Sequence, residues 1–200
     1  MVTDGTTEIY SNAVRLNLLS VEITQQPENI SVYAGEETTL TVTATGDNLK
    51  YRWQWSKNDS PWKNCTSVGS DTDTFAFVME PRFDGRKYRC VITRGKSQIF
   101  SDAVDLTLKP LSVVKTPEDV RESAGKQVTL KIEADGLNVQ YQWERRKSAT
   151  GRWRSCFSEG SNTDTFSFEL MSSYSGRQYR CKITNGYETV YTEPINIEVE

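Results

Sequence analysis

The stretch WKNCTSVGSDTDTFAF at residues 62–77 decides how the chain is organised, because it returns ninety-one residues later as WRSCFSEGSNTDTFSF at residues 153–168. Ten of the sixteen letters are identical. Further matches continue on both sides of the stretch, and they include Pro27/Pro117, Gly35/Gly125, Leu40/Leu130, Tyr51/Tyr141, Trp53/Trp143, Gly85/Gly176, Tyr88/Tyr179 and Cys90/Cys181. A repeat of this length indicates two copies of one structural unit, with a boundary near Lys109-Pro110-Leu111.

A third, partial copy occupies the first residues of the chain. VTDGTTEIYSNAVRLNL at 2–18 resembles ITRGKSQIFSDAVDLTL at 92–108, which is the end of the first complete copy. We therefore interpret residues 1–20 as the last strands of a preceding repeat. Its apolar side chains, Ile9, Val14, Leu16 and Leu18, need a partner, so we expect the segment to pair with a neighbour or to stay disordered.

The apolar residues of both copies alternate with polar ones. In residues 39–46, Leu40, Val42 and Ala44 alternate with threonines, and Phe75, Phe77 and Met79 share one side of the next such run. A period of two is typical of a strand with one buried face. About seven short runs of this kind occur in each ninety-residue copy, separated by Gly, Asn, Asp or Pro. This pattern predicts an all-β chain that forms two sandwiches of two sheets each.

Charge and cysteine content narrow the possible environments. The net charge of −3 gives no support for sequence-independent nucleic-acid binding. The four cysteines are twenty-five residues apart within each copy: Cys65 and Cys90, Cys156 and Cys181. An even count at a repeated spacing predicts one disulfide bond in each copy, and hence an extracellular location. The alternative is a pair of reduced, buried thiols in a cytosolic protein.

Catalytic and metal motifs are missing from the sequence. The chain contains no histidine, which excludes Ser-His-Asp or Cys-His catalysis and a Cys/His zinc site. The runs SDTDT at 70–74 and SNTDT at 161–165 could offer calcium two side chains each, but we interpret them as turns whose Asp and Asn side chains cap their own backbone. We therefore expect no enzyme activity, no cofactor and no metal.

The residues around Trp53, Trp143 and the two Tyr-Arg-Cys runs resemble immunoglobulin-like domains. In that family a core tryptophan is followed along the chain by a tyrosine that stands two residues before a cysteine. The hydroxyl of this tyrosine forms a hydrogen bond to the main chain, an arrangement called the tyrosine corner. Trp53 and Trp143 match the tryptophan, and Tyr88 and Tyr179 match the tyrosine. The resemblance covers nearly the whole chain and implies tandem immunoglobulin-like sandwiches, similar in style to repeats of large bacterial surface proteins.

One departure from that family concerns the disulfide bonds. The family's first cysteine position is taken by Val42 and Ile132. The remaining cysteines, Cys65 and Cys156, follow the core tryptophans by twelve or thirteen residues. The resemblance therefore implies a different bridge in each copy, Cys65 to Cys90 and Cys156 to Cys181, between the strand after Trp62 or Trp153 and the Tyr-x-Cys strand.

Five cations crowd one hairpin of the second copy. In WERRKSATGRWRS at 143–155, the cations lie beside Trp153, and the candidate ligand-binding residues are Arg145, Arg146, Arg152, Trp153 and Arg154. Such a basic, aromatic edge could bind an anionic glycan or an acidic protein. The alternative is that these charges protect an edge strand from aggregation, and we favour it because the first copy has fewer of them.

We thus expect a preceding remnant at 1–20, one immunoglobulin-like domain at 21–110 and a second at 111–200. The linkers around Leu19-Ser20 and Lys109-Pro110 are short and contain no flexible Gly/Ser-rich sequence. They therefore predict that the modules form a semi-rigid rod. The expected function is a non-catalytic spacer and adhesion or protein-binding segment of a bacterial surface or secreted protein. Its partners would be an unknown protein or glycan and the neighbouring immunoglobulin-like repeats of the same chain, with no nucleic acid and no membrane insertion of this segment. A glycan-binding accessory module of a secreted enzyme and a eukaryotic receptor ectodomain are the alternatives.

Overall fold

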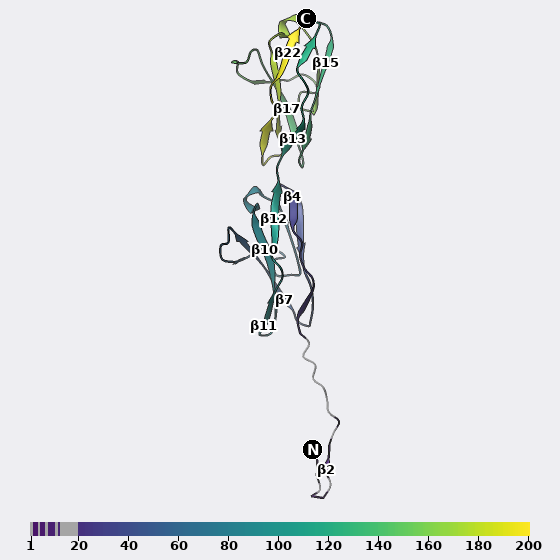
Figure 1. Cartoon of the computed structure of the whole chain (residues 1–200), viewed down its shortest axis with the longest axis vertical. Helices are drawn as coiled ribbons and strands as arrows, with labels where there is room; N and C mark the ends of the chain where they lie inside the picture. The colour runs from purple at the N-terminus through teal and green to yellow at the C-terminus, as the bar shows by residue number, and fades with distance from the viewer. Residues whose placement is uncertain (1, 4, 7, 11, 13–19) are drawn as a thin grey trace.

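The computed structural model describes residues 2–3, 5–6, 8–10, 12 and 20–200. The fold is all-β and consists of two tandem immunoglobulin-like β-sandwiches arranged end to end along one axis (Figure 1). Each sandwich has its own cluster of buried side chains, and no residue belongs to both clusters. The chain therefore forms two cores rather than one.

The first sandwich contains the strands between residues 22 and 109. Five strands form one sheet in the order β4-β12-β10-β7-β8, and a sixth strand, β11, pairs with β10. The facing layer consists of two strand pairs, β3 with β6 and β5 with β9. The bounds are β3 Glu22–Gln25, β4 Ile30–Tyr33, β5 Glu37–Thr41, β6 Thr43–Thr45, β7 Lys50–Lys57, β8 Lys63–Asn64, β9 Thr74–Val78, β10 Arg86–Arg94, β11 Ser97–Phe100 and β12 Val104–Lys109, with a 3-10 turn η1 at Pro81–Phe83.

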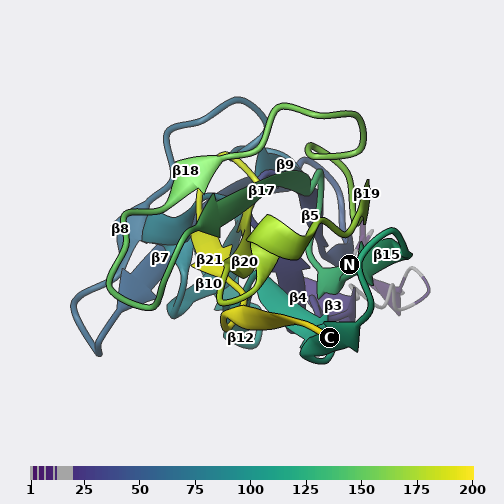
Figure 2. The ribbon, with the colours of Figure 1, turned by 90° about the horizontal axis from the view of Figure 1, so that it is seen from above.

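The second sandwich repeats this topology. Its larger sheet has the order β14-β22-β20-β17-β18, and β21 pairs with β20. The facing layer consists of two strand pairs, β13 with β16 and β15 with β19. The bounds are β13 Ser112–Lys115, β14 Val120–Glu122, β15 Gln127–Lys131, β16 Glu133–Asp135, β17 Gln140–Arg146, β18 Arg154–Ser155, β19 Thr165–Glu169, β20 Gln178–Thr184, β21 Thr189–Tyr191 and β22 Ile195–Val199, with η2 at Ser172–Tyr174. Viewed down the long axis, the edge strands β8 and β18 lie toward the same side of the molecule (Figure 2).

A tryptophan on the central strand fills each core. Trp53 on β7 and Trp143 on β17 are completely buried. The indole Nε1 of each donates a 3.0 Å hydrogen bond to a loop carbonyl, that of Thr72 or Thr163. Phe75 and Phe166 stack against these rings from the facing sheet, with centroids 6.3 and 5.9 Å apart. The predicted alternation of residues 75, 77 and 79 is observed, because Phe75 and Met79 are buried and Phe77 packs against the same core.

The four cysteines are not bridged, so the predicted disulfide bonds are wrong. Cys65, Cys90, Cys156 and Cys181 are all free and buried. In the first sandwich, β7 lies between the two thiols: Trp53 is the register partner of Cys90 on one side, and its carbonyl accepts a 2.9 Å hydrogen bond from the Cys65 amide on the other. Two strand spacings amount to about 9.5 Å, whereas bridged cysteines have Cα atoms at most about 7 Å apart.

The same geometry separates the second pair of cysteines. Trp143 is the register partner of Cys181, and its carbonyl accepts a 2.8 Å hydrogen bond from the Cys156 amide. Burial raises the pKa of Cys65 and Cys181 to about 12 and that of Cys90 and Cys156 to about 11. The thiols are therefore protonated core side chains at neutral pH, and they say nothing about the redox state of the compartment.

The tyrosines are anchored differently from the expected tyrosine corner. Tyr88 and Tyr179 are buried on β10 and β20. The Tyr88 hydroxyl accepts a hydrogen bond from Arg86 Nη1 at 3.4 Å, whereas the resemblance implied a hydroxyl that bonds to the main chain. Burial raises the pKa of both tyrosines, and the neighbouring guanidinium of Arg86 or Arg177 opposes that shift.

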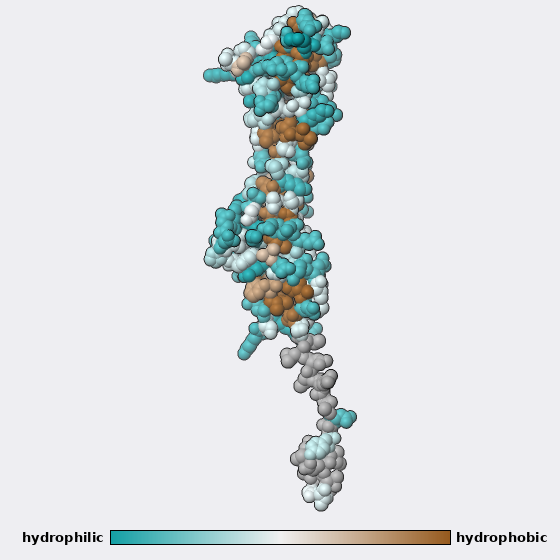
Figure 3. Space-filling view, viewed as in Figure 1, coloured by the Kyte–Doolittle hydropathy of each residue, from teal (hydrophilic) through white to brown (hydrophobic). Residues whose placement is uncertain are grey.

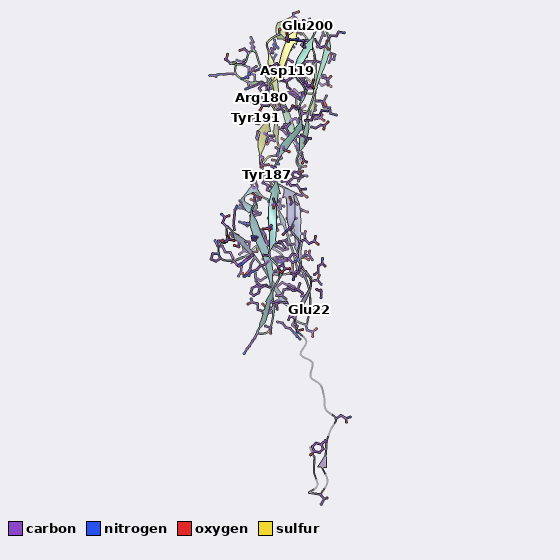
Figure 4. All side chains as sticks on the ribbon, viewed as in Figure 1. Glu22, Asp119, Arg180, Tyr187, Tyr191 and Glu200 are labelled. Carbon is purple, nitrogen blue, oxygen red and sulfur yellow. The ribbon has the colours of Figure 1, made fainter. Side chains whose placement is uncertain are left out.

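Direct contacts join the two sandwiches. The Tyr33 hydroxyl donates a 2.6 Å hydrogen bond to Asp135 Oδ1, and this bond raises the pKa of Tyr33. Gly35 has a φ of +86°, and a Cβ there would lie 3.0 Å from the Tyr187 ring. Tyr187 lies at the boundary between the two units (Figure 4). Leu111 in the connection is itself buried in the second core.

The described part of the N-terminal segment forms a small hairpin. Val2 pairs with Ile9 and Thr3 with Glu8 across β1 (Val2–Thr3) and β2 (Glu8–Ile9). The aligned hairpin of the first sandwich has the same register, since Ile92 pairs with Ile99. The backbone of Ile9 is therefore paired with that of Val2, whereas Val14, Leu16 and Leu18 lie outside the described residues.

We predict that Trp143→Phe lowers the free energy of unfolding of the second sandwich by about 2–4 kcal/mol. The change leaves a cavity and deprives the Thr163 carbonyl of its donor. Urea denaturation followed by amide resonances of each sandwich measures the loss. Val114→Ala, at an exposed position of β13, is the control and changes stability by less than about 0.5 kcal/mol. An equal loss in both variants would contradict the assigned role of Trp143.

We also predict that all four thiols react with iodoacetamide after denaturation without reductant, because none is bridged. In the native protein the reaction is slow, since burial both shields the sulfur atoms and keeps them protonated. Intact mass after a timed reaction counts the adducts. Two cysteines per sandwich that alkylate only after dithiothreitol treatment would contradict the strand order described above.

Candidate functional site

A cationic pocket forms where the β17–β18 hairpin meets the start of β20. It has a volume of about 390 Å³ and is lined by Arg145, Arg146, Lys147, Gly151, Arg152, Arg154 and Arg177. Four of the five sequence-predicted candidates therefore line one pocket, and Trp153 does not. Lys147 and Gly151 come from the same hairpin. Arg177 comes from the turn before β20 and was missed by the sequence analysis.

The register of the hairpin places like charges opposite each other. Arg145 on β17 pairs directly with Arg154 on β18. Like charges at directly opposed positions of an antiparallel pair are destabilising. Among residues 20–200, the ion pairs join Arg82 to Glu80, Lys87 to Asp105, Arg94 to Asp47, Arg121 to Glu198 and Arg180 to Glu144, so none includes a residue that lines the pocket. The positive charge of the pocket is thus not neutralised by those pairs.

Arg177 is half-buried and lines the pocket from the turn before β20. Its guanidinium lies over the Tyr174 ring of η2, 3.7 Å from the ring centroid. Its Nη1 is buried and has no hydrogen-bond partner. A buried guanidinium N–H without an acceptor is costly and is normally satisfied by a protein group, water or ligand. The sequence did contain a signal for this residue, because Arg stands two positions before the tyrosine in both copies.

Trp153 supports the pocket from outside. The Arg146 and Arg180 guanidinium groups lie over its ring at 4.5 and 4.4 Å. Arg180 also lies over Tyr191 at 4.2 Å and forms a 2.7 Å ion pair with Glu144; Figure 4 shows Arg180 and Tyr191 close together. Cations already occupy this ring, so Trp153 is a structural element of the sheet face and not an open platform for stacking a sugar.

The first sandwich has the same framework with different chemistry. Arg89 lies over Trp62 and Phe100 at 4.3 and 4.4 Å, which matches the arrangement of Arg180. Arg86, the counterpart of Arg177, lies over Trp55 and Phe83 at 3.9 and 4.4 Å. Trp55 occupies the position of Arg145. An aromatic ring therefore covers the buried arginine in the first sandwich, whereas a second arginine stands there in the second.

The acidic turns contain threonine-centred bonds. The Thr72 hydroxyl donates to the carbonyls of Gly69 or Thr74 at 3.0 and 2.6 Å, and Thr163 does the same in the second sandwich. The main-chain carbonyls of these two threonines accept the hydrogen bonds from the indole N–H groups of the core tryptophans. Threonines, rather than the Asp and Asn that we expected, therefore hold these turns. In the part of the chain that the structure describes, no group of three His, Cys, Asp or Glu side chains is arranged to hold a metal ion.

The surface is mostly hydrophilic, with apolar patches on each sandwich (Figure 3). Phe157, next to the cationic hairpin, is 92% exposed. Within the described ranges, no helix has the length and apolar character needed to cross a membrane.

These observations define a tandem pair of immunoglobulin-like modules, the second of which carries a cationic pocket. No family model matches the chain. It is 30% identical over 182 residues to Endoglucanase C of Cellulomonas fimi, covering 89% of this chain and 16% of that protein. It is 27% identical over 135 residues to human Neogenin, covering 63% of this chain and 9% of that one. The chain thus spans a small part of either relative.

Among solved structures, the chain resembles the I-band fragment I67-I69 from titin. The sequence identity is 16%, the match covers 92% of this chain and 66% of that chain, and the TM-score is 0.43.

We predict that Arg154→Glu raises the free energy of unfolding of the second sandwich by about 0.5–1 kcal/mol in low-salt buffer, because an opposite charge then faces Arg145. Urea denaturation at low and high salt measures the gain, which shrinks as salt screens the pair. Lys63→Glu is the matched control, since its register partner is Trp55 and no arginine pair is relieved there. If Arg154→Glu destabilised the sandwich at every salt concentration, the charge conflict would not exist.

Proposed function

We propose that the chain is a non-catalytic pair of immunoglobulin-like modules that acts as a spacer and as an adhesion or protein-binding segment of a larger bacterial surface or secreted protein. The observation that carries the spacer role is the junction between the sandwiches. Two contacts cross this junction: Tyr33 donates a hydrogen bond to Asp135, and Tyr187 packs on Gly35. Within the connection itself, Leu111 is buried. In this proposal these contacts oppose the independent motion that tandem domains otherwise show.

The proposed absence of catalysis is supported by the side chains that are present. The chain has no histidine to act as a base at neutral pH. Its four thiols are buried, with pKa values raised to about 11 or 12, so they are weak nucleophiles. We propose the domain limits 21–110 and 111–200, with residues 1–20 as the end of a preceding module. The matching hairpin register of β1–β2 and β10–β11 supports that reading of the N-terminus.

The second candidate function is a glycan-binding accessory module of a carbohydrate-active enzyme. The match to Endoglucanase C favours it, because 89% of this chain aligns with a bacterial protein whose name describes a glycan-cleaving enzyme. The extracellular location that we propose rests on this match and on the module architecture, since the free thiols remove the argument from disulfide bonds. Binding of neutral cello-oligosaccharides, followed by calorimetry, would favour the accessory module over the spacer.

We predict that residual dipolar couplings from both sandwiches fit one alignment tensor, because the junction fixes their orientation. In the double variant Tyr33→Phe/Tyr187→Ala the hydrogen bond and the ring packing are lost, and two different tensors are expected. Met171→Ala, an exposed residue after β19 at a distance from these contacts, is the control and keeps one tensor. Two tensors in the unmodified chain would contradict the spacer function.

A further inference from the structure

We propose that the cationic pocket of the second sandwich binds sulfate or carboxylate groups of an anionic polysaccharide. The proposal deepens the binding part of the proposed function and rests on it. It concerns the pocket lined by the hairpin of residues 145–154 and by Arg177.

The charges in this pocket exceed what edge protection requires. The first sandwich has the same strand order and the same short edge strand, yet it has only Lys63 on β8 and Trp55 opposite it. In the second sandwich two arginines face each other at the corresponding positions. Residues 145–158 contain five cations and no acidic residue. A bound anion would remove the repulsion that this arrangement creates.

The geometry of the lining favours oxyanions. Five of the seven lining residues are arginines, whose planar guanidinium groups bind carboxylate, sulfate and phosphate through paired N–H donors. Arg177 Nη1 is a buried donor that has no acceptor within the protein. Stacking on Tyr174 at 3.7 Å fixes its guanidinium in place. The hairpin arginines, together with the exposed part of Arg177, are the donors that an oxyanion in the pocket would meet.

A polysaccharide fits the pocket better than an acidic peptide. Peptides are commonly held by main-chain pairing to a sheet edge together with apolar pockets for their side chains. The edge strand β18 is only two residues long, and the lining has no apolar side chain. The volume of about 390 Å³ lies within the usual range for a ligand site. Recognition therefore depends on repeated charge, which a sulfated or uronic-acid chain supplies.

Recognition should not depend on sugar stacking. The ring of Trp153 is covered by Arg146 and Arg180, so it offers no open face near the pocket. We expect an uncharged polysaccharide of the same backbone to bind at least about a hundredfold more weakly than its sulfated form, because each lost charge-assisted contact costs about tenfold in affinity.

The test is a calorimetric titration of the full chain with a sulfated dextran oligosaccharide, the matching unsulfated dextran, an oligogalacturonate and poly-L-glutamate. We expect the sulfated or carboxylated sugar to bind, with affinity falling as salt rises. Arg154→Gln and Arg152→Gln should each weaken binding by about tenfold. Lys63→Gln, at the position in the first sandwich that matches Arg154, should leave binding unchanged. Amide spectra of each variant confirm that it remains folded.

Each contrary outcome has a defined meaning. No binding of either anionic sugar, or equal binding of unsulfated dextran, overturns the site. Binding that survives both arginine substitutions places the anion elsewhere and overturns the assignment. Poly-L-glutamate binding as tightly as the sugars overturns the polysaccharide class. Because the dipolar-coupling experiment uses no ligand, failure here leaves the spacer function intact, and failure there leaves this site intact.

Discussion

The structure depends on one buried indole in each sandwich. Trp53 and Trp143 occupy the central strands of the larger sheets, and each donates its N–H to a threonine carbonyl in the loop before the next strand. This bond fixes the loop that closes the core, and the threonine hydroxyl then holds the same turn. The strand that carries the indole also separates the two thiols of its sandwich. Aromatic packing and hydrogen bonds, and no covalent bridge, therefore close both cores.

The two copies share one strand arrangement but differ in the side chains beside the buried tyrosine. Both sandwiches have an arginine two residues before the buried tyrosine of the central strand. In the first copy Trp55 covers that arginine. In the second copy Arg145 stands there, and the adjoining hairpin contributes further cations. The second copy thus has a cluster of cations where the first copy stacks an aromatic ring on its arginine, and the buried tryptophan and tyrosine beneath are kept in both.

The sequence predicted the strands well because a buried face imposes a period of two, as residues 75, 77 and 79 show. Sequence similarity between the copies also identified the core tryptophans and the tandem organisation. The absence of disulfide bonds could not be predicted from the sequence. The spacing of the cysteines along the chain does not reveal that β7 lies between Cys65 and Cys90 in the sheet. Arg177 was missed for a related reason. It is thirty-two residues from Arg145 along the chain, and only the pairing of β17 with β20 brings the two to one pocket.

The central claim is that two of the five tryptophans close the cores without covalent help. Hydrogen exchange of the five indole N–H groups, measured by NMR in the presence of dithiothreitol, tests it most directly. We expect the indoles of Trp53 and Trp143 to exchange only through unfolding of their own sandwich, while those of Trp55, Trp62 and Trp153 exchange faster. Fast exchange of the Trp53 and Trp143 indoles in reductant would contradict the account.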